Sequence, residues 1–244
     1  MSTSVESANA VVRVQPGADV VAGIEWFTVT GAEPPQGSSM QFDDPSTTLA
    51  PPLPGVKPEQ HADVKQAERH VRQTLSKTTG FVGAVLLAGH RGELVVYSQW
   101  DKTTALPTVF PDAWSIAPGV RHLARHEARL FDAFFTGPNP ITEISVAETP
   151  QAHFGWFTVT PENQPKMLEL ARRHAPDSFN VPGLKAVNFH RGLDSRRVVN
   201  LGLWSNFDQM SELRLRPGFK EGAKYWMEVA GFRPHYFNVA AVVA

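Results

Sequence analysis

Hydrophobic and polar residues alternate along four segments in the second half of the chain, and such alternation predicts β-strands. A turn-like stretch rich in Gly, Asp and Ser, residues 191–195, separates the second segment from the third and predicts a hairpin. The four expected strands are residues 152–160, 183–191, 196–204 and 232–243.

Apolar residues at helical spacing predict a helix between the first two of these strands. Thr160 is the expected N-cap, with Pro161 at the first helical position, and Pro176 ends the helix. A second helical stretch is expected from Asn206 toward Ala230, interrupted by Pro217 and Gly218. The resulting order, strand, helix, strand, strand, helix, strand, is that of a ferredoxin-like domain.

The first half shows the same order of patterns. Expected strands lie at residues 20–30, 80–89, 93–100 and 141–148, and expected helices at 60–75 and 120–135. Each half therefore predicts one ferredoxin-like unit.

Short repeated sequences indicate that the two halves arose by duplication. The pentapeptide WFTVT occurs at residues 26–30 and again at 156–160, HRG occurs at 90–92 and 190–192, and Trp100 and Trp204 each end a later strand. The two copies of WFTVT lie 130 residues apart, whereas Trp100 and Trp204 lie 104 apart. About 26 additional residues therefore sit in the first half, and the Pro-rich stretch 31–58 is their expected place, either as a disordered insert or as a lid over a pocket.

A ferredoxin-like sheet has helices on one face only, so its other face needs a partner. Two such sheets from one chain can cover each other. We therefore expect an α+β fold in which two tandem ferredoxin-like domains pack their antiparallel sheets into a pseudo-symmetric α+β barrel. The expected boundaries are a flexible tail at 1–19, a first repeat at 20–149 and a second repeat at 150–244.

Composition narrows the function. The chain has 23 basic and 24 acidic residues, a formal net charge of -1, which provides no broad attraction for nucleic acid or an anionic membrane. No apolar run is long enough to cross a bilayer and the N-terminus lacks a signal-peptide pattern, so a cytoplasmic location is expected. With no cysteine, thiolate metal sites and cysteine nucleophiles are excluded.

The expected strand 196–204 carries the most informative side chains. Val198, Asn200, Gly202 and Trp204 share one face because side chains alternate along a strand, and the opposite face is aliphatic and suits packing between sheets. An amide and an indole about 13 Å apart, with Gly202 leaving space between them, are typical of a pocket floor. In the first half, Val96 and Ser98 stand at the positions of Asn200 and Gly202, so the second half is the better candidate for an active site.

With its duplicated halves and its Asn-x-x-x-Trp strand, the chain resembles the antibiotic biosynthesis monooxygenases over roughly residues 20–243. The resemblance implies that Asn200 and Trp204 are catalytic and that the substrate is an aromatic polyketide oxidised by molecular oxygen without a metal. The tandem layout is similar to that of oxygenases that open the B ring of angucyclines. Met210 and Lys224 stand where some members have an assisting Tyr and Arg, which leaves the proton-transfer residues open.

Other residues are candidates for binding the substrate: Trp156, His190, Tyr225, Trp226 and His235. Large aromatics often only fill a core, and a strand histidine is often only hydrogen-bonded, so these structural roles stay open. His122 and His126 have the spacing of a helical metal pair, but the arginines beside them are typical of a solvated basic face, and no metal site is expected.

The chemistry leaves alternatives open. Quinone formation needs only substrate and oxygen, whereas Baeyer-Villiger ring opening needs a peroxide, for which reduced flavin (FADH2 or FMNH2) is a source. The sequence has no GxGxxG fingerprint, so no tightly bound cofactor is expected and flavin would be a diffusible cosubstrate supplied by a flavin reductase. A homodimer is compatible with this design. A polyketide cyclase and a non-enzymatic binder of a flat hydrophobic metabolite are the alternative functions.

Overall fold

The computed structural model describes most of the chain. The described residues are 10–29, 58–89, 92–102, 107, 109–120, 122–207 and 226–244. Most of the Pro-rich stretch 31–58, most of the helical stretch expected after Asn206, and Tyr225 lie outside them.

Both halves follow one order of elements. The first half contains β2 (Val20–Val29), α1 (Pro58–Gln73), β3 (Phe81–Gly89), β4 (Leu94–Asp101) and β5 (Leu123–Gly137). The second contains β7 (Gln151–Val159), α2 (Gln164–His174), β8 (Leu184–Gly192), β9 (Arg197–Trp204) and β10 (Ala230–Val243). Short 3-10 helices lie at Leu75–Lys77, Asp112–Trp114, Ala117–Gly119 and Ala175–Ser178.

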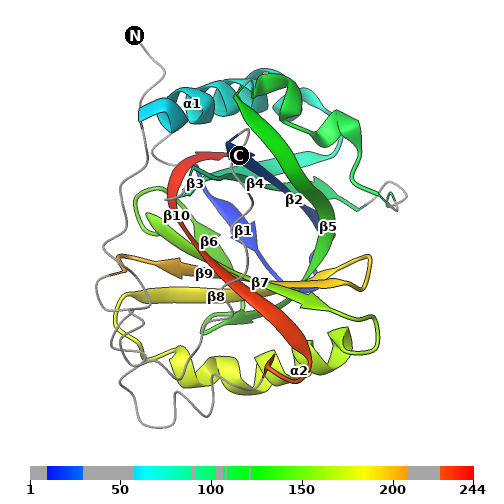
Figure 1. Ribbon diagram of the computed structural model, residues 1–244. Helices are drawn as coiled ribbons and strands as arrows, with labels where there is room; N and C mark the ends of the chain where they lie inside the picture. The colour runs from blue at the N-terminus through cyan, green and yellow to red at the C-terminus, as the bar shows by residue number, and fades with distance from the viewer. Residues whose placement is uncertain are drawn as a thin grey trace.

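Eight antiparallel strands close into one barrel (Figure 1) in the order β10-β3-β4-β2-β5-β8-β9-β7. Within each half, the last strand lies beside the first, then the third, then the second, which is the strand order of a ferredoxin-like sheet. The long strands β5 and β10 pair with β8 and β3 of the other half and so close the barrel. The expected α+β barrel of two tandem ferredoxin-like units is confirmed.

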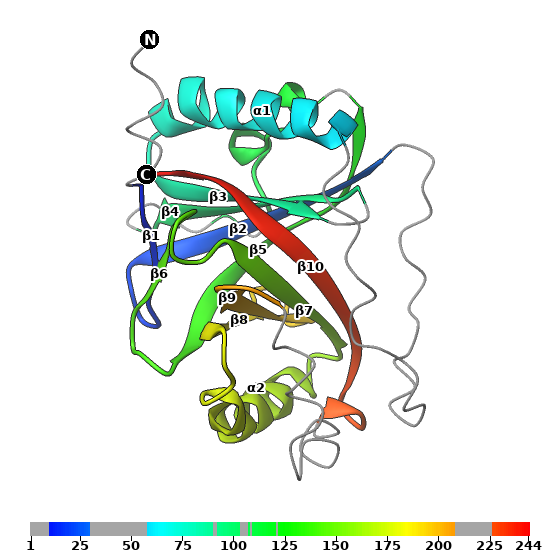
Figure 2. The same ribbon diagram turned by 90° about the vertical axis from the view of Figure 1, so that its left-hand side faces the viewer.

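Helices α1 and α2 cover opposite outer faces of the barrel, as Figure 2 shows with α1 above the sheets and α2 below them. Val64, Ala67 and Val71 of α1 pack on the outer face of the first sheet, and Met167 and Leu168 of α2 pack on that of the second. A third cluster fills the barrel interior between the sheets. Each sheet therefore buries both faces.

The repeated WFTVT sequence places two tryptophans in that interior. Trp26 of β2 and Trp156 of β7 meet edge to face, with ring centroids 5.4 Å apart. They are 4% and 6% exposed, and both belong to the interior cluster. Equivalent side chains thus meet near the pseudo-symmetry axis, which gives this repeat a packing role.

The prediction of a helix at 120–135 is wrong, because residues 123–137 form the strand β5. Its Ala, Arg, Glu and Leu content favours a helix locally, but β5 pairs with β2 along one edge and with β8 along the other. Those two ladders are needed to close the barrel, so tertiary pairing overrides local propensity. The helical face expected for His122 and His126 therefore does not exist; His126 lies on the strand and His122 precedes it.

A two-stranded ribbon packs against the interior cluster. β1 (Val12–Val14) pairs with β6 (Thr142–Ile144), and Val12, Val14 and Ile144 join the interior core. The residues 12–14 that were expected within a flexible tail are therefore a paired strand. The strand expected at 141–148 is only the three-residue β6, and it pairs with β1 and not with the barrel.

The start of α2 also differs from expectation. The helix begins at Gln164 with Asn163 as N-cap, while Thr160 accepts backbone hydrogen bonds from Asn163 and Gln164 in a preceding turn. Pro165, within the first turn, takes the place expected for Pro161 because a helix tolerates proline there. The end before Pro176 is as expected.

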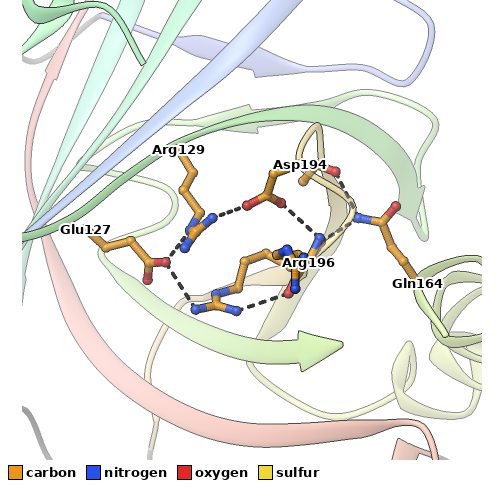
Figure 3. Close-up of polar contacts among 7 residues, drawn as sticks. Glu127, Arg129, Gln164, Asp194 and Arg196 are labelled. Atoms are coloured by element: carbon orange, nitrogen blue, oxygen red, sulfur yellow. Dashed lines mark hydrogen bonds and ion pairs between the residues drawn. The ribbon is translucent and has the colours of Figure 1, made fainter. Parts of the chain in front are cut away.

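A polar network fastens the β8–β9 hairpin to its neighbours (Figure 3). Arg129 of β5 pairs with Glu127 and with Asp194 of the hairpin, and Arg197 pairs with Glu127 at 3.2 Å. Gln164 at the start of α2 donates to the carbonyl oxygens of Gly192 and Arg197 at 2.8 and 2.9 Å. The network fixes α2 and β5 to the strand that carries Asn200 and Trp204.

Candidate functional site

Asn200, Gly202 and Trp204 lie on the outer face of β9, toward α2. Val198, on the same face, packs with the α2 residues, whereas Val199, Leu201 and Leu203 point into the barrel interior. This division confirms the expected alternation, in which the aliphatic face packs sheet against sheet.

Three polar atoms on this face are buried and have no hydrogen-bond partner among the described residues. One is Oε1 of Gln151, which lies opposite Trp204 on β7, and the other two are Trp204 Nε1 and Asn200 Oδ1. Trp204 as a whole is 3% exposed, while Asn200 is half-buried. Leaving a buried polar group unpaired costs about 1–3 kcal/mol, so such groups usually meet a water or a ligand.

Gly202 leaves room between the side chains of Asn200 and Trp204. A Cβ atom built on it would meet nothing closer than 3.4 Å, and its two nearest neighbours are Trp204 Nε1 and His153 Nδ1, each at that distance. One strand away, Gly155 is paired with Asn200, and a Cβ there would lie 3.1 Å from the Phe232 ring. Two glycines on adjacent strands thus leave this part of the face without side chains of its own.

Aromatic rings border the region around Gly202 and Gly155 at both ends. Beside Trp204, the rings of Phe207 and Tyr236 have centroids 5.6 Å apart. Beyond Asn200, Phe232 lies 4.7 Å from Phe157 and 4.9 Å from Trp226. The face therefore offers aromatic surface with a few polar atoms, the usual composition of a site for an apolar ring system.

His153 belongs to this face although nothing in the sequence marked it. It lies on β7 directly opposite Gly202, and its ring centroid is 5.5 Å from that of Tyr236. Burial, and secondarily the nearby His235, lower the pKa of His153 to about 4, so the ring is neutral at pH 7. Alternation from Phe157 places it on the outer face, but only the β7–β9 register brings it to Gly202.

The equivalent face of the first half is internally satisfied. Trp100 Nε1 donates to Ser98 Oγ at 2.9 Å, and Ser98 Oγ donates to the Gly23 carbonyl oxygen at 3.2 Å. Trp114 stacks on Trp100 with ring centroids 4.3 Å apart and planes 2° from parallel. No space is left, since a Cβ on Gly23 would lie 2.9 Å from Phe110.

A buried carboxylate helps to hold in place the segment around Trp114, which covers Trp100. Glu25 of β2 is 1% exposed and accepts hydrogen bonds from Ser115 Oγ and from the backbone N–H of Ile116. Burial raises the pKa of Glu25, and these hydrogen bonds and Arg125 oppose the rise. Its second-half counterpart is Gly155, which cannot anchor a segment in this way.

Trp156 and His190 are not brought together with Asn200 and Trp204, because both point into the barrel interior. Trp156 packs against Trp26 and Phe131. His190 Nδ1 donates to the Asn188 carbonyl oxygen at 3.1 Å, which leaves Nε2 to accept from the Tyr97 hydroxyl at 3.1 Å.

Burial lowers the pKa of His190 to about 4. Gln99 donates to the Tyr97 hydroxyl oxygen at 3.3 Å and so continues this hydrogen-bonded chain inside the barrel. The chain joins a strand of each half, and its pairing is that of a structural network.

His235 also lies on the interior side. Its Nδ1 is 3.1 Å from Glu93 Oε1, and its ring centroid is 4.3 Å from that of Trp26. Of the five residues expected to bind substrate, Trp226 is placed on the same face as Asn200, and Tyr225 lies outside the described residues.

Comparison with solved structures supports the fold. No protein-family model matches the sequence, and no curated protein matches it at a significant level. An anthrone oxidase-like protein is similar over 95% of both chains, with a TM-score of 0.65 and 15% identity. A provisionally assigned monooxygenase from Fusobacterium nucleatum is similar over 93% of this chain and 95% of its own, with a TM-score of 0.59 and 13% identity. At these identities the similarity establishes the tandem ferredoxin-like barrel.

No helix within the described residues is long and apolar enough to span a membrane. The same residues contain no group of three or more His, Asp or Glu side chains that could hold a metal ion.

Proposed function

We propose that this protein is an oxygenase that oxidises a polycyclic hydroxyaromatic compound on the outer face of the second sheet. One observation carries the proposal: on an aromatic face with Gly202 between them, Asn200 Oδ1 and Trp204 Nε1 are buried and have no hydrogen-bond partner in the described part of the chain. At the equivalent place in the first half, the indole N–H is paired with Ser98 and its ring is covered by Trp114.

The chemistry needs little from the protein. An electron-rich hydroxyaromatic that has lost its proton can donate electrons to molecular oxygen, so the site has to exclude water, stabilise the anion and hold the ring. The Asn200 carboxamide offers a donor to a developing oxyanion, because its oxygen and nitrogen exchange places by a half-turn. Trp204 offers its single N–H to a further oxygen substituent of the ring system.

The substrate class we propose is an aromatic polyketide, oxidised either to a quinone or by opening of an angucycline B ring. Support comes from the Asn-x-x-x-Trp strand and the tandem layout, and from a fold shared with an anthrone oxidase-like protein. Ring opening requires a peroxide, and reduced flavin is the diffusible cosubstrate we propose for it, supplied by a flavin reductase.

Oxygen consumption tests the proposal directly. Dissolved oxygen is followed with an anthrone and with an angucyclinone, each with and without reduced flavin, using the wild type and Trp204→Phe. Enzyme-dependent uptake that falls at least tenfold in the variant is expected. Product without uptake would favour a cyclase, and tight binding without product would favour a carrier; either result rejects the oxygenase. Dependence on flavin separates ring opening from quinone formation.

Trp100→Phe is the matched control, because Trp100 occupies the equivalent position in a face that is already filled. Its rate of oxygen uptake should stay within about twofold of the wild type. A loss as large as that of Trp204→Phe would mean that the site is not confined to the second half.

A further inference from the structure

The space over Gly202 is bordered by two ring nitrogens of different chemistry. Trp204 Nε1 and His153 Nδ1 both lie 3.4 Å from the position that a Cβ on Gly202 would occupy. No hydrogen bond joins the His153 ring to the rest of the described chain, and the indole N–H is unpaired there as well. A ligand atom just above the Gly202 position is therefore within reach of both nitrogens.

The two nitrogens together match one kind of group. An indole N–H can only donate, whereas a neutral imidazole nitrogen without its hydrogen can only accept. A hydroxyl does both: its oxygen accepts from Trp204 and its hydrogen is donated to His153. A carbonyl oxygen or a methyl group in the same place satisfies at most one of the two.

Burial of His153 favours its neutral form, and the nearby His235 acts in the same direction. Tyr236 on β10 faces it across the strand pair, and His235 lies beside Tyr236 on the interior side. With its pKa lowered to about 4, His153 keeps an accepting nitrogen throughout the neutral range. Such a nitrogen is a poor base for a phenol-like hydroxyl, whose pKa is about 10. It is suited to orient a hydroxyl and not to remove its proton.

We propose that His153 and Trp204 form a two-point clamp that selects and orients a hydroxyl group on a flat aromatic ligand. His153 is a positioning residue: its Nδ1 accepts the hydrogen bond, while its Nε2 carries the ring hydrogen. The ligand class rests on the proposed oxygenase function, but the clamp can be tested by binding alone.

The test compares two probes of nearly the same shape, 2-naphthol and 2-methylnaphthalene, whose binding is followed by quenching of tryptophan fluorescence. The wild type should prefer 2-naphthol by about fivefold, the equivalent of one net hydrogen bond. His153→Phe should lose this preference while its Kd for 2-methylnaphthalene stays within about twofold. His153→Gln, whose side-chain oxygen can accept, should recover part of the preference. Circular dichroism confirms that each variant is folded.

His122→Phe is the control, because His122 is an exposed histidine of the first half whose side chain is 77% accessible, and the preference should remain unchanged. Equal affinity of the wild type for both probes, no binding of either, or a preference that survives in His153→Phe would overturn the clamp.

The experiments can reject the proposed clamp and the proposed oxygenase function independently of each other. Loss of the hydroxyl preference in His153→Phe, without oxygen uptake on any substrate, supports the clamp and rejects the oxygenase. Oxygen uptake in the wild type together with an unchanged preference in His153→Phe rejects the clamp alone.

Discussion

Trp100 and Trp204 occupy equivalent positions in two copies of one sheet, but their indole N–H groups differ. In the first half, Ser98 Oγ accepts from Trp100, and Trp114 covers the ring. In the second, Gly202 replaces that serine, and the N–H of Trp204 is buried without a partner among the described residues.

The neighbouring strand shows the opposite difference: the first half has a glycine where the second half has a large side chain. Gly23 of the first half has no room for a side chain, because a Cβ would lie 2.9 Å from Phe110 and from Ser98 Oγ. Its counterpart is His153, whose ring borders the space over Gly202. The outer face around Trp100 is thus packed and hydrogen-bonded, while the face around Trp204 keeps polar atoms that have no partner among the described residues. Such atoms cost about 1–3 kcal/mol each and are available to a ligand.

The largest expected effect is on the free energy of unfolding. It concerns the hydrogen-bonded network of His190, Tyr97 and Gln99 in the barrel interior, which joins the two halves. The pKa of His190 falls from 6.5 to about 4 on folding, so the unfolded chain binds this proton more readily. The resulting stability is present above pH 6.5 and is lost as the pH falls toward 4, by up to about 3 kcal/mol.

Urea unfolding of the wild type and His190→Gln at pH 7 and pH 4 measures this contribution. The difference in free energy of unfolding between the two proteins should shrink by about that amount at the lower pH. An unchanged difference would mean that His190 is not the titrating group.

Replacing Asn200 with valine, the residue of the first half at position 96, should lower turnover about a hundredfold, as expected for loss of a donor to an oxyanion. The free energy of unfolding should stay the same or rise, because an unpaired amide oxygen is removed. Oxygen uptake and urea unfolding measure the two effects. Turnover close to that of the wild type would place the oxyanion contact elsewhere.

Replacing Trp204 or Trp100 with phenylalanine should have different effects and so distinguish the two halves. Trp204→Phe should lower turnover about tenfold, a loss of about 1.4 kcal/mol of transition-state stabilisation, with little change in stability. Trp100→Phe should leave turnover unchanged and lower the free energy of unfolding by about 1 kcal/mol, because the bond to Ser98 is lost. If both variants lost only stability, the comparison between the halves would fail.

The smallest expected effect comes from making one half resemble the other. Gly202→Ser supplies the hydroxyl that Trp204 lacks, so the free energy of unfolding should rise by up to about 1 kcal/mol while turnover falls, because the space is filled. Ser98→Gly should have the opposite effect on stability and none on turnover. Thermal melting and steady-state rates measure both, and a faster Gly202→Ser enzyme would contradict the assignment of the space to a ligand.

Local patterns were sufficient for much of the fold. Alternation in 196–204 correctly divided Asn200 and Trp204 from Leu201 and Leu203. The same reasoning failed for 120–135, where helix-favouring residues form β5, because the pairing that closes the barrel outweighs a propensity of a few tenths of a kcal/mol per residue. It also missed His153, because strand register depends on partners far away in the sequence.

The amino-acid sequence by itself determined the duplication, the α+β class and the two faces of β9, because these follow from repeats and from the period of side chains along a strand. Only the tertiary structure decided which side chains meet. It placed Trp156, His190 and His235 inside the barrel and left Trp204 facing His153 across Gly202. The physical reason is that barrel closure fixes the register of every strand at once, and a pattern along one strand does not contain that information.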